Sequence, residues 1–143
     1  TRACIYKLGK GFLVDEKLED ELARKQVEDL DIKIASIDDL ITTLSGGNMQ
    51  KVVVGNWLNT NPKVMFLDEP SRGIDVNAKQ QIFEIMWNMA RNGIPSVVVS
   101  TELEELIEIC HRILVIKDGE FIDEVYPENL TVEKLYSLCM GEN

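Results

Sequence analysis

The chain has 143 residues, of which 45% are hydrophobic and 28% charged, so it can bury the core of one soluble domain. Its formal charge of −10 opposes binding to nucleic acid, because proteins hold phosphate backbones by neutralising them with lysine and arginine. No apolar run reaches the roughly 18 to 20 residues that span a bilayer. Three scattered cysteines form neither a disulfide framework nor a zinc pattern, which favours a reduced, cytoplasmic setting.

The first 40 or so residues are predicted to contain a solvated helix. Acidic and basic residues alternate through 15–31, as is typical of an exposed helix face. Within this stretch Leu18, Leu22 and Leu30 lie among apolar positions near helical spacing. The chain therefore begins with a charged helical segment.

From residue 48 onwards, helix and strand alternate. A helix is predicted over 48–58, directly after a pair of glycines. The short apolar run over 64–67 is closed by Asp-Glu-Pro and predicts a buried strand. The apolar stripe of 78–91 predicts a further helix, and Gly93 is expected to end it in a left-handed conformation.

A second strand and a short helix follow. The apolar run over 96–99 predicts another buried strand. Thr101 and Glu104 have the spacing of a capping box, which predicts a helix up to about residue 110.

The chain is predicted to end in a hairpin and a helix. Strands over 112–116 and 120–125 are joined by Asp118-Gly119, which is a strong signal for a tight hairpin turn. Thr131 is expected to cap a last helix that ends near residue 140.

Alternating strands and helices predict an α/β fold with a mostly parallel sheet flanked by helices. An N-terminal helical segment precedes this sheet, and the C-terminal β-hairpin adds an antiparallel margin before the last helix. We expect a single domain over 1–143, divided into a helical part over 1–60 and a core over 61–143.

The first candidate binding motif is Leu44-Ser45-Gly46-Gly47-Asn48-Met49-Gln50. A serine and two glycines at a helix start can present a hydroxyl and backbone N–H groups to phosphate oxygens, and the helix dipole adds positive charge. Taken alone, the same residues could equally be a simple helix cap.

The second candidate motif is the pair Asp68 and Glu69, which follows the apolar run over 64–67. A carboxylate at the exposed end of a buried strand is well placed to hold Mg²⁺. A neighbouring carboxylate can orient or deprotonate a water molecule. Asp-Glu-Pro could also be a plain turn.

Together with Ser71-Arg72-Gly73-Ile74-Asp75, these motifs resemble the ATP-binding cassette (ABC) family. They stand in the family's order of signature, Walker B, D-loop and switch strand, over roughly residues 40 to 125. Three segments are most similar to the second cassette of double-cassette importers for simple sugars, whose forms are NQQKV, TRGVDV and SSE. The corresponding segments here are Asn48-Met49-Gln50-Lys51-Val52, Ser71-Arg72-Gly73-Ile74-Asp75-Val76 and Ser100-Thr101-Glu102.

The resemblance implies a partial P-loop NTPase domain that uses ATP and Mg²⁺. In this family two cassettes enclose ATP head to tail, so that the signature of one faces the nucleotide held by the other. The residues implied at the signature site are Leu44, Ser45, Gly46, Gly47, Asn48 and Gln50. By the same resemblance Asp68 assists Mg²⁺, Glu69 is the general base, and Asp75 lies at the interface between cassettes.

Two features depart from the family pattern. No Gly-rich loop ending in Lys-Ser/Thr (Walker A) is found, and Leu8-Gly9-Lys10-Gly11 is read as an ordinary loop. The Walker A part is expected before Thr1, so the chain is expected to be a fragment whose exposed sheet edge invites self-association.

The second departure is Thr101, which stands where the family has its switch histidine. A threonine hydroxyl can hydrogen-bond a phosphate but cannot carry the charge of an imidazole. A helix N-cap is the alternative interpretation of Thr101.

The function implied is the ATP-hydrolysing subunit of an importer for simple sugars, of which this segment alone should be inactive. It would act at the cytoplasmic face of the cell membrane with a second cassette, permease subunits and, indirectly, a sugar-binding protein. One alternative is a non-catalytic cassette that only donates its signature. Another is a soluble ABC ATPase acting on ribosomes or DNA, which the negative charge opposes.

Overall fold

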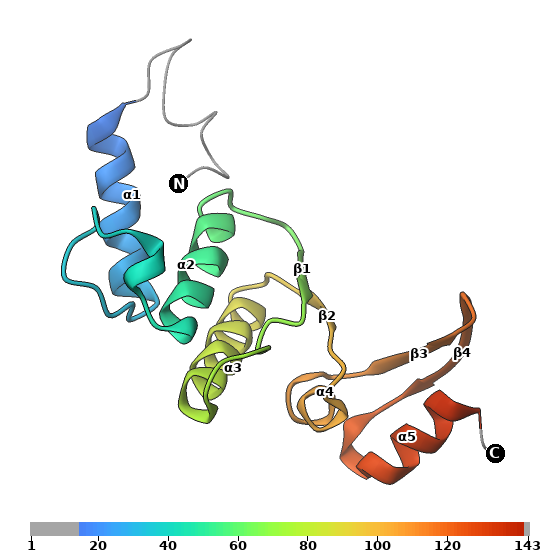
Figure 1. Ribbon diagram of the computed structural model, residues 1–143. Helices are drawn as coiled ribbons and strands as arrows, with labels where there is room; N and C mark the ends of the chain where they lie inside the picture. Colours follow the sequence, from blue (N-terminus) through green and yellow to red (C-terminus); the bar gives the residue numbers. More distant parts are fainter. Residues whose placement is uncertain (1–14, 142–143) are drawn as a thin grey trace. The chain divides into compact units, whose positions relative to one another are not determined.

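The computed structural model describes residues 15–141, which fall into two units (Figure 1). The first unit contains the described residues up to Met65 together with Ser71–Ser96. The second contains Phe66–Pro70 and the described residues from Val97 onwards. The loop predicted at Leu8–Gly11 lies outside the described residues, and the predicted division at residue 60 stays a prediction.

The first unit is mainly helical. Its elements are α1 (Glu16–Asp29), the 3-10 turn η2 (Ile41–Thr43), α2 (Gly46–Leu58) and α3 (Val76–Arg91). Helix α1 is the predicted N-terminal helix, and it begins where the side chain of Asp15 accepts hydrogen bonds from the N–H groups of Lys17 and Leu18. Within residues 15–141, no helix is both long and apolar enough to cross a membrane.

The core of the first unit lies between α2 and α3, which pack side by side (Figure 1). One stripe of α3 is buried, as its periodicity predicts; its residues are Ile82, Phe83, Ile85, Met86 and Met89. Gly93, just beyond α3, has the predicted left-handed conformation, with φ of 78°.

Strands β1 (Met65–Asp68) and β2 (Ser96–Val99) pair in one two-stranded sheet. The N–H of Met65 donates to the carbonyl of Pro95 at 3.0 Å, and the N–H of Glu69 donates to the carbonyl of Val99 at 2.8 Å. Both bonds join residues with the same separation in sequence, so the strands run parallel, as predicted.

The remaining elements belong to the second unit. They are α4 (Leu103–Ile109), β3 (Ile113–Lys117), β4 (Glu120–Val125), the 3-10 turn η3 (Pro127–Asn129) and α5 (Val132–Met140). Strands β3 and β4 form the predicted hairpin, and both Asp118 and Gly119 have the positive φ that a tight primed turn requires. Thr131 caps α5 as predicted, because its hydroxyl accepts a hydrogen bond from the N–H of Lys134.

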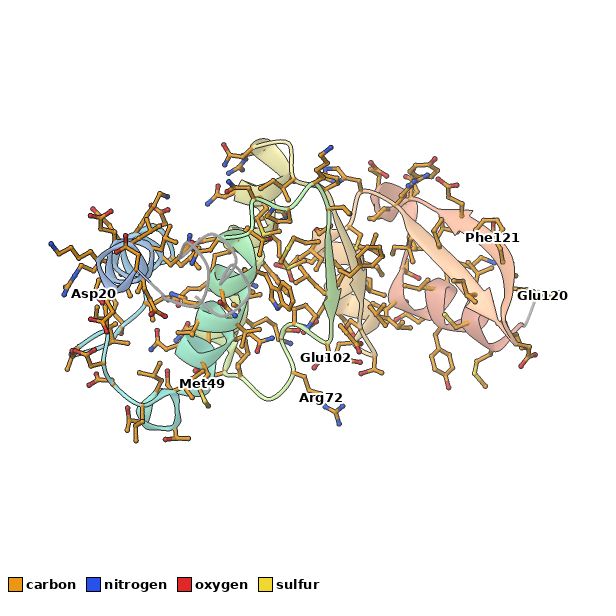
Figure 2. All side chains as sticks on the ribbon, turned by 90° about the horizontal axis from the view of Figure 1, so that it is seen from above. Asp20, Met49, Arg72, Glu102, Glu120 and Phe121 are labelled. Atoms are coloured by element: carbon orange, nitrogen blue, oxygen red, sulfur yellow. The ribbon has the colours of Figure 1, made fainter. Side chains whose placement is uncertain are left out.

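The core of the second unit forms under one face of the hairpin. Ile113, Val115 and Leu135 are buried there. On the other face of the hairpin the apolar side chains of Ile116 and Phe121 stay exposed (Figure 2). The expectation that the hairpin forms the margin of the parallel sheet is wrong, because the described strands form two separate sheets.

The predicted capping box at Thr101 is also wrong. Helix α4 begins only at Leu103, and its N-cap, Glu102, makes no side-chain cap hydrogen bond. The reason is that the N–H of Thr101 donates to Glu69 instead, and the N–H of Glu102 donates to the hydroxyl of Ser100. Long-range and local bonds to the turn thus replace the cap that the spacing predicts.

Candidate functional site

The predicted signature residues form the start of α2, in the first unit. Leu44 follows the turn η2, and Ser45 is the N-cap of the helix. The Ser45 hydroxyl accepts hydrogen bonds from the backbone N–H of Asn48 at 3.4 Å and from its side-chain nitrogen at 3.0 Å. Gly46 and Gly47 are the first two helical residues, so α2 begins two residues earlier than the sequence predicts.

The two glycines lie against the segment that carries Asp75. A Cβ atom placed on Gly47 would lie 2.4 Å from the Cβ of Ala78, which is too close for any side chain. A Cβ on Gly46 would lie 3.4 Å from Cγ2 of Ile74. The structure therefore brings the start of α2 and the start of α3 together, and glycine at position 47 makes this approach possible.

Asp75 has a structural task in this arrangement. It is the N-cap of α3, and its Oδ1 accepts a hydrogen bond from the N–H of Ala78 at 3.0 Å. This cap explains why α3 begins at Val76, two residues before the predicted start.

Two polar side chains of α2 fasten the helix to the segment that follows α1. Oδ1 of Asn48 accepts a hydrogen bond from the N–H of Lys33 at 2.9 Å. The ammonium group of Lys51 is buried and donates to the carbonyl of Asp31 at 3.0 Å. Burial lowers the pKa of Lys51. Sequence reasoning assigned no role to Lys51, because its partner is a backbone carbonyl that only the folded chain brings near.

Gln50 is partly exposed on α2, next to Lys51. It lies one helical turn beyond Gly46 and Gly47, on the same helix as the other predicted signature residues.

Of the two predicted carboxylates, Asp68 ends β1 and Glu69 follows it, both in the second unit. Asp68 is exposed and Glu69 is half-buried. Glu69 has φ of 48°, a left-handed conformation that non-glycine residues rarely adopt and that is common at functional sites. Its Oε1 accepts a hydrogen bond from the N–H of Thr101 at 2.9 Å. The structure thus brings together Glu69 and Thr101, which lie far apart in the sequence.

The turn containing Thr101 is itself held by polar contacts. The hydroxyl of Ser100 donates to Oε2 of Glu105 at 3.2 Å and accepts a hydrogen bond from the N–H of Glu102 at 3.1 Å. Glu105 is only 3% exposed. Sequence reasoning missed Glu105, although its spacing of four residues from the apolar Ile109 places it on the buried stripe of α4.

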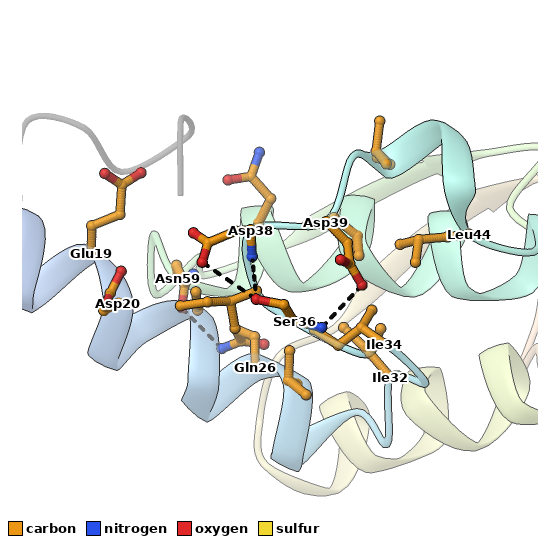
Figure 3. A pocket seen from close by; sticks show the side chains of 16 residues that line it. Glu19, Asp20, Gln26, Ile32, Ile34, Ser36, Asp38, Asp39, Leu44 and Asn59 are labelled. Atoms are coloured by element: carbon orange, nitrogen blue, oxygen red, sulfur yellow. Dashed lines mark hydrogen bonds between the residues drawn. The ribbon is translucent and has the colours of Figure 1, made fainter.

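A cavity of about 420 Å³ lies in the first unit, between α1, the segment over 32–44 and α2 (Figure 3). Apolar side chains line it, with four carboxylates among them: Glu19, Asp20, Asp38 and Asp39. Asp39 accepts hydrogen bonds from the N–H groups of Ala35 and Ser36, and Asp38 accepts one from the Ser36 hydroxyl. Two of the four carboxylates therefore shape the loop, and among the predicted site residues Leu44 alone lines the cavity.

Residues 10–72 match the family described as ABC transporter. This segment of the chain belongs to the ABC transporter family.

Curated relatives of this ABC segment are import proteins for sugars by name. The arabinose import ATP-binding protein AraG of Vibrio parahaemolyticus is 42% identical over 138 residues, which are 96% of this chain and 27% of that protein. The ribose import ATP-binding protein RbsA of Bacillus subtilis is 39% identical, over 90% of this chain and 26% of that protein. The chain therefore spans about a quarter of the length of these relatives.

Solved structures confirm the predicted fold class. An ATP-binding cassette of an ABC transporter is 27% identical, with a TM-score of 0.72 over 92% of this chain and 50% of that chain. A dimeric cassette in a post-hydrolysis state, with ADP and Pi bound, has a TM-score of 0.68 at 22% identity, over 85% of this chain and 52% of that chain. The second likeness supports the fold alone.

Proposed function

We propose that the chain is part of the ATP-hydrolysing subunit of an importer for simple sugars, in which ATP hydrolysis drives transport. The observation that carries the proposal is the carboxylate of Glu69, which ends a strand and is bound by the N–H of Thr101 from the turn after the neighbouring strand. The names of the arabinose and ribose import relatives support the substrate class.

Asp68 and Glu69 are the residues assigned to the chain's own nucleotide. The exposed carboxylate of Asp68 suits Mg²⁺, which proteins bind through one or two carboxylates together with substrate phosphates. Bound Mg²⁺ would neutralise charge on those phosphates. Glu69 is the general base, because its half-buried carboxylate follows the strand and one of its oxygens is held in place by the N–H of Thr101.

The start of α2 is the surface assigned to the nucleotide of a second cassette. Ser45, Gly46 and Gly47 lie at a helix N-terminus, where unpaired N–H groups and the helix dipole favour a phosphate. Leu44 precedes this start, and Asn48 and Gln50 lie within its first turn and a half. Asp75 is assigned to the interface between cassettes, close to the same helix start.

The partners follow from this assignment. The chain would act with a second cassette and with permease subunits, on the cytoplasmic face of the cell membrane, and indirectly with a sugar-binding protein. ATP and Mg²⁺ would be its cofactors.

A second candidate function is a cassette that donates its signature without hydrolysing ATP. The observation that favours it is Thr101, whose side chain cannot supply the charge of the switch histidine found in the family.

Glu69→Gln in the complete transporter separates the two functions. We expect ATP turnover to fall by about a hundredfold or more, because a positioned general base contributes roughly 10²–10⁴-fold. The matched control is Glu104→Gln, which changes an exposed carboxylate on α4. Turnover near that of the control would exclude catalysis at Glu69 and leave the signature-donating role.

A further inference from the structure

The turn after β2 is organised by a buried carboxylate that lies outside the motifs described above. Oε2 of Glu105 accepts a hydrogen bond from the Ser100 hydroxyl at 3.2 Å, and that hydroxyl accepts one from the N–H of Glu102 at 3.1 Å. Ser100 therefore ties the turn both to α4 and to its own following residues.

Thr101 directly follows Ser100, whose hydroxyl makes both of these contacts. Its N–H belongs to the planar peptide that joins Ser100 to Thr101, so the direction in which it points depends on how that peptide is oriented. This N–H donates to Oε1 of Glu69 at 2.9 Å, and the N–H of Glu69 donates to the carbonyl of Val99 at 2.8 Å. The carboxylate of Glu69 is thus bound to a turn whose conformation depends on Ser100.

We propose that Glu105 is a positioning residue for the carboxylate of Glu69, acting through the hydroxyl of Ser100 and the backbone N–H of Thr101. The proposal rests on the catalytic role proposed for Glu69. It adds a buried residue that determines where the general base is held.

Burial supports a specific task for Glu105. A carboxylate that is removed from water is disfavoured unless it accepts hydrogen bonds, and position 105 shares the buried stripe of α4 with Ile109. An apolar side chain would suit that stripe better. A carboxylate there is explained by the bond that it accepts from Ser100.

The same chain of contacts is compatible with a threonine at the switch position. The donor to Glu69 is a backbone N–H, which every residue except proline supplies. Glu69 can therefore be held without an imidazole at position 101.

The test compares four variants of the complete protein: Ser100→Ala, Glu105→Leu, the double variant of both, and Glu105→Gln. We expect Ser100→Ala and Glu105→Leu each to lower kcat for ATP by about tenfold while KM changes by less than about twofold, because the nucleotide contacts remain. The double variant should be no slower than the slower single variant, since both changes break one chain of contacts. Glu105→Gln should retain most of kcat, because an amide oxygen can accept the bond from Ser100.

Hydrogen exchange of the nucleotide-free protein gives a readout independent of activity. Glu105→Leu should speed exchange of the amides of residues 101 and 102, whereas the control Glu104→Leu, on the exposed face of the same helix, should leave it unchanged. Unchanged exchange and unchanged kcat in Glu105→Leu would overturn the proposal, as would additive losses in the double variant or a Gln variant as slow as the Leu variant.

Glu69→Gln, measured in parallel, separates this proposal from the proposed function. If Glu69→Gln keeps full turnover, the catalytic role of Glu69 is wrong, and the exchange experiment alone decides whether Glu105 positions that side chain.

Discussion

At the scale of single residues, the contact between Gly47 and Ala78 leaves no space for a methyl group. We expect Gly47→Ala to destabilise the protein by about 1–3 kcal/mol, the usual range for overpacking, because its Cβ would lie 2.4 Å from that of Ala78. Urea unfolding measures the loss.

Two further variants make this prediction specific. Gly46→Ala is the matched control, because its Cβ would meet ordinary contacts of 3.4 Å or more, and it should be tolerated. Ala78→Gly should restore most of the stability of Gly47→Ala, less the roughly 0.5–1 kcal/mol that glycine costs in a helix. Equal losses in both glycine variants would contradict the close contact.

Cys110 and Cys139 should differ in reactivity toward a thiol reagent. Burial raises the pKa of the Cys110 thiol, which packs against the core beneath the hairpin, whereas Cys139 is exposed on α5. Because the thiolate is the nucleophile, Cys110 should react more slowly near neutral pH. Mass spectrometry of a Cys4→Ser variant after brief labelling measures the extent of labelling at both cysteines. Unfolding the protein in urea should make the two labelling rates equal. Faster labelling of Cys110 than of Cys139 in the native protein would refute the predicted order of reactivity.

Single-residue predictions from sequence were reliable where the cause is local. Ser45 and Thr131 cap the helices that follow them, and Asp118-Gly119 forms the hairpin turn, because each depends on neighbours within a few residues. Lys51 could not be assigned, because its partner is the backbone carbonyl of Asp31 in another segment. Glu105 was missed because its partner, Ser100, lies in an irregular turn that gives no periodic signal.

At the scale of elements, Asp75 can be separated into its two roles. Its side chain caps α3, so Asp75→Ala should cost about 1 kcal/mol of stability, whereas Asp75→Asn keeps the capping oxygen and should cost little. If Asp75 also couples cassettes, Asp75→Asn in the complete transporter should lower ATP turnover without lowering the melting temperature.

The control for this experiment is Asp15, which caps α1 in the same way but lies outside the predicted site. Asp15→Asn should leave both turnover and stability unchanged. Equal ATP turnover in Asp75→Asn and Asp15→Asn would show that Asp75 acts only as the N-cap of α3.

Hydrophobic periodicity predicts which helices form but not the residue at which each helix begins. The buried stripe of α3 was predicted correctly, but α2 and α3 each begin two residues before the predicted start. In both cases the capping residue sets the start, since Ser45 caps α2 and Asp75 caps α3. The capping box at Thr101 failed for the opposite reason, since the pattern was present but the N–H of Thr101, one of its donors, bonds to Glu69 instead.

At the scale of the whole molecule, the 143-residue chain alone should bind MgATP weakly. Most contacts to a nucleotide in this family are implied to come from a phosphate loop that the printed sequence does not contain. Calorimetry should show no saturable binding at micromolar MgATP, and micromolar affinity would contradict the expectation.

The fold class was predictable from the alternation of strands and helices, but the arrangement of the strands was not. A four-residue apolar run carries no information about its neighbour, so the sequence could not show that the hairpin forms a sheet of its own. The candidate site was predictable as a set of motifs. Which motifs touch depends on pairing between distant segments, as in the bond from Thr101 to Glu69.

The bond from the N–H of Glu69 to the carbonyl of Val99 can form only after both strands have been synthesised. A ribosome adds about 5–20 residues per second, so β2 follows β1 by a few seconds. During that interval the N–H of Glu69 lacks the carbonyl of Val99, and its carboxylate lacks the N–H of Thr101. A nascent chain that stalls between the two strands would thus display Asp68 and Glu69 without these bonds, and the growing polypeptide gains them only when residues 99–101 leave the exit tunnel.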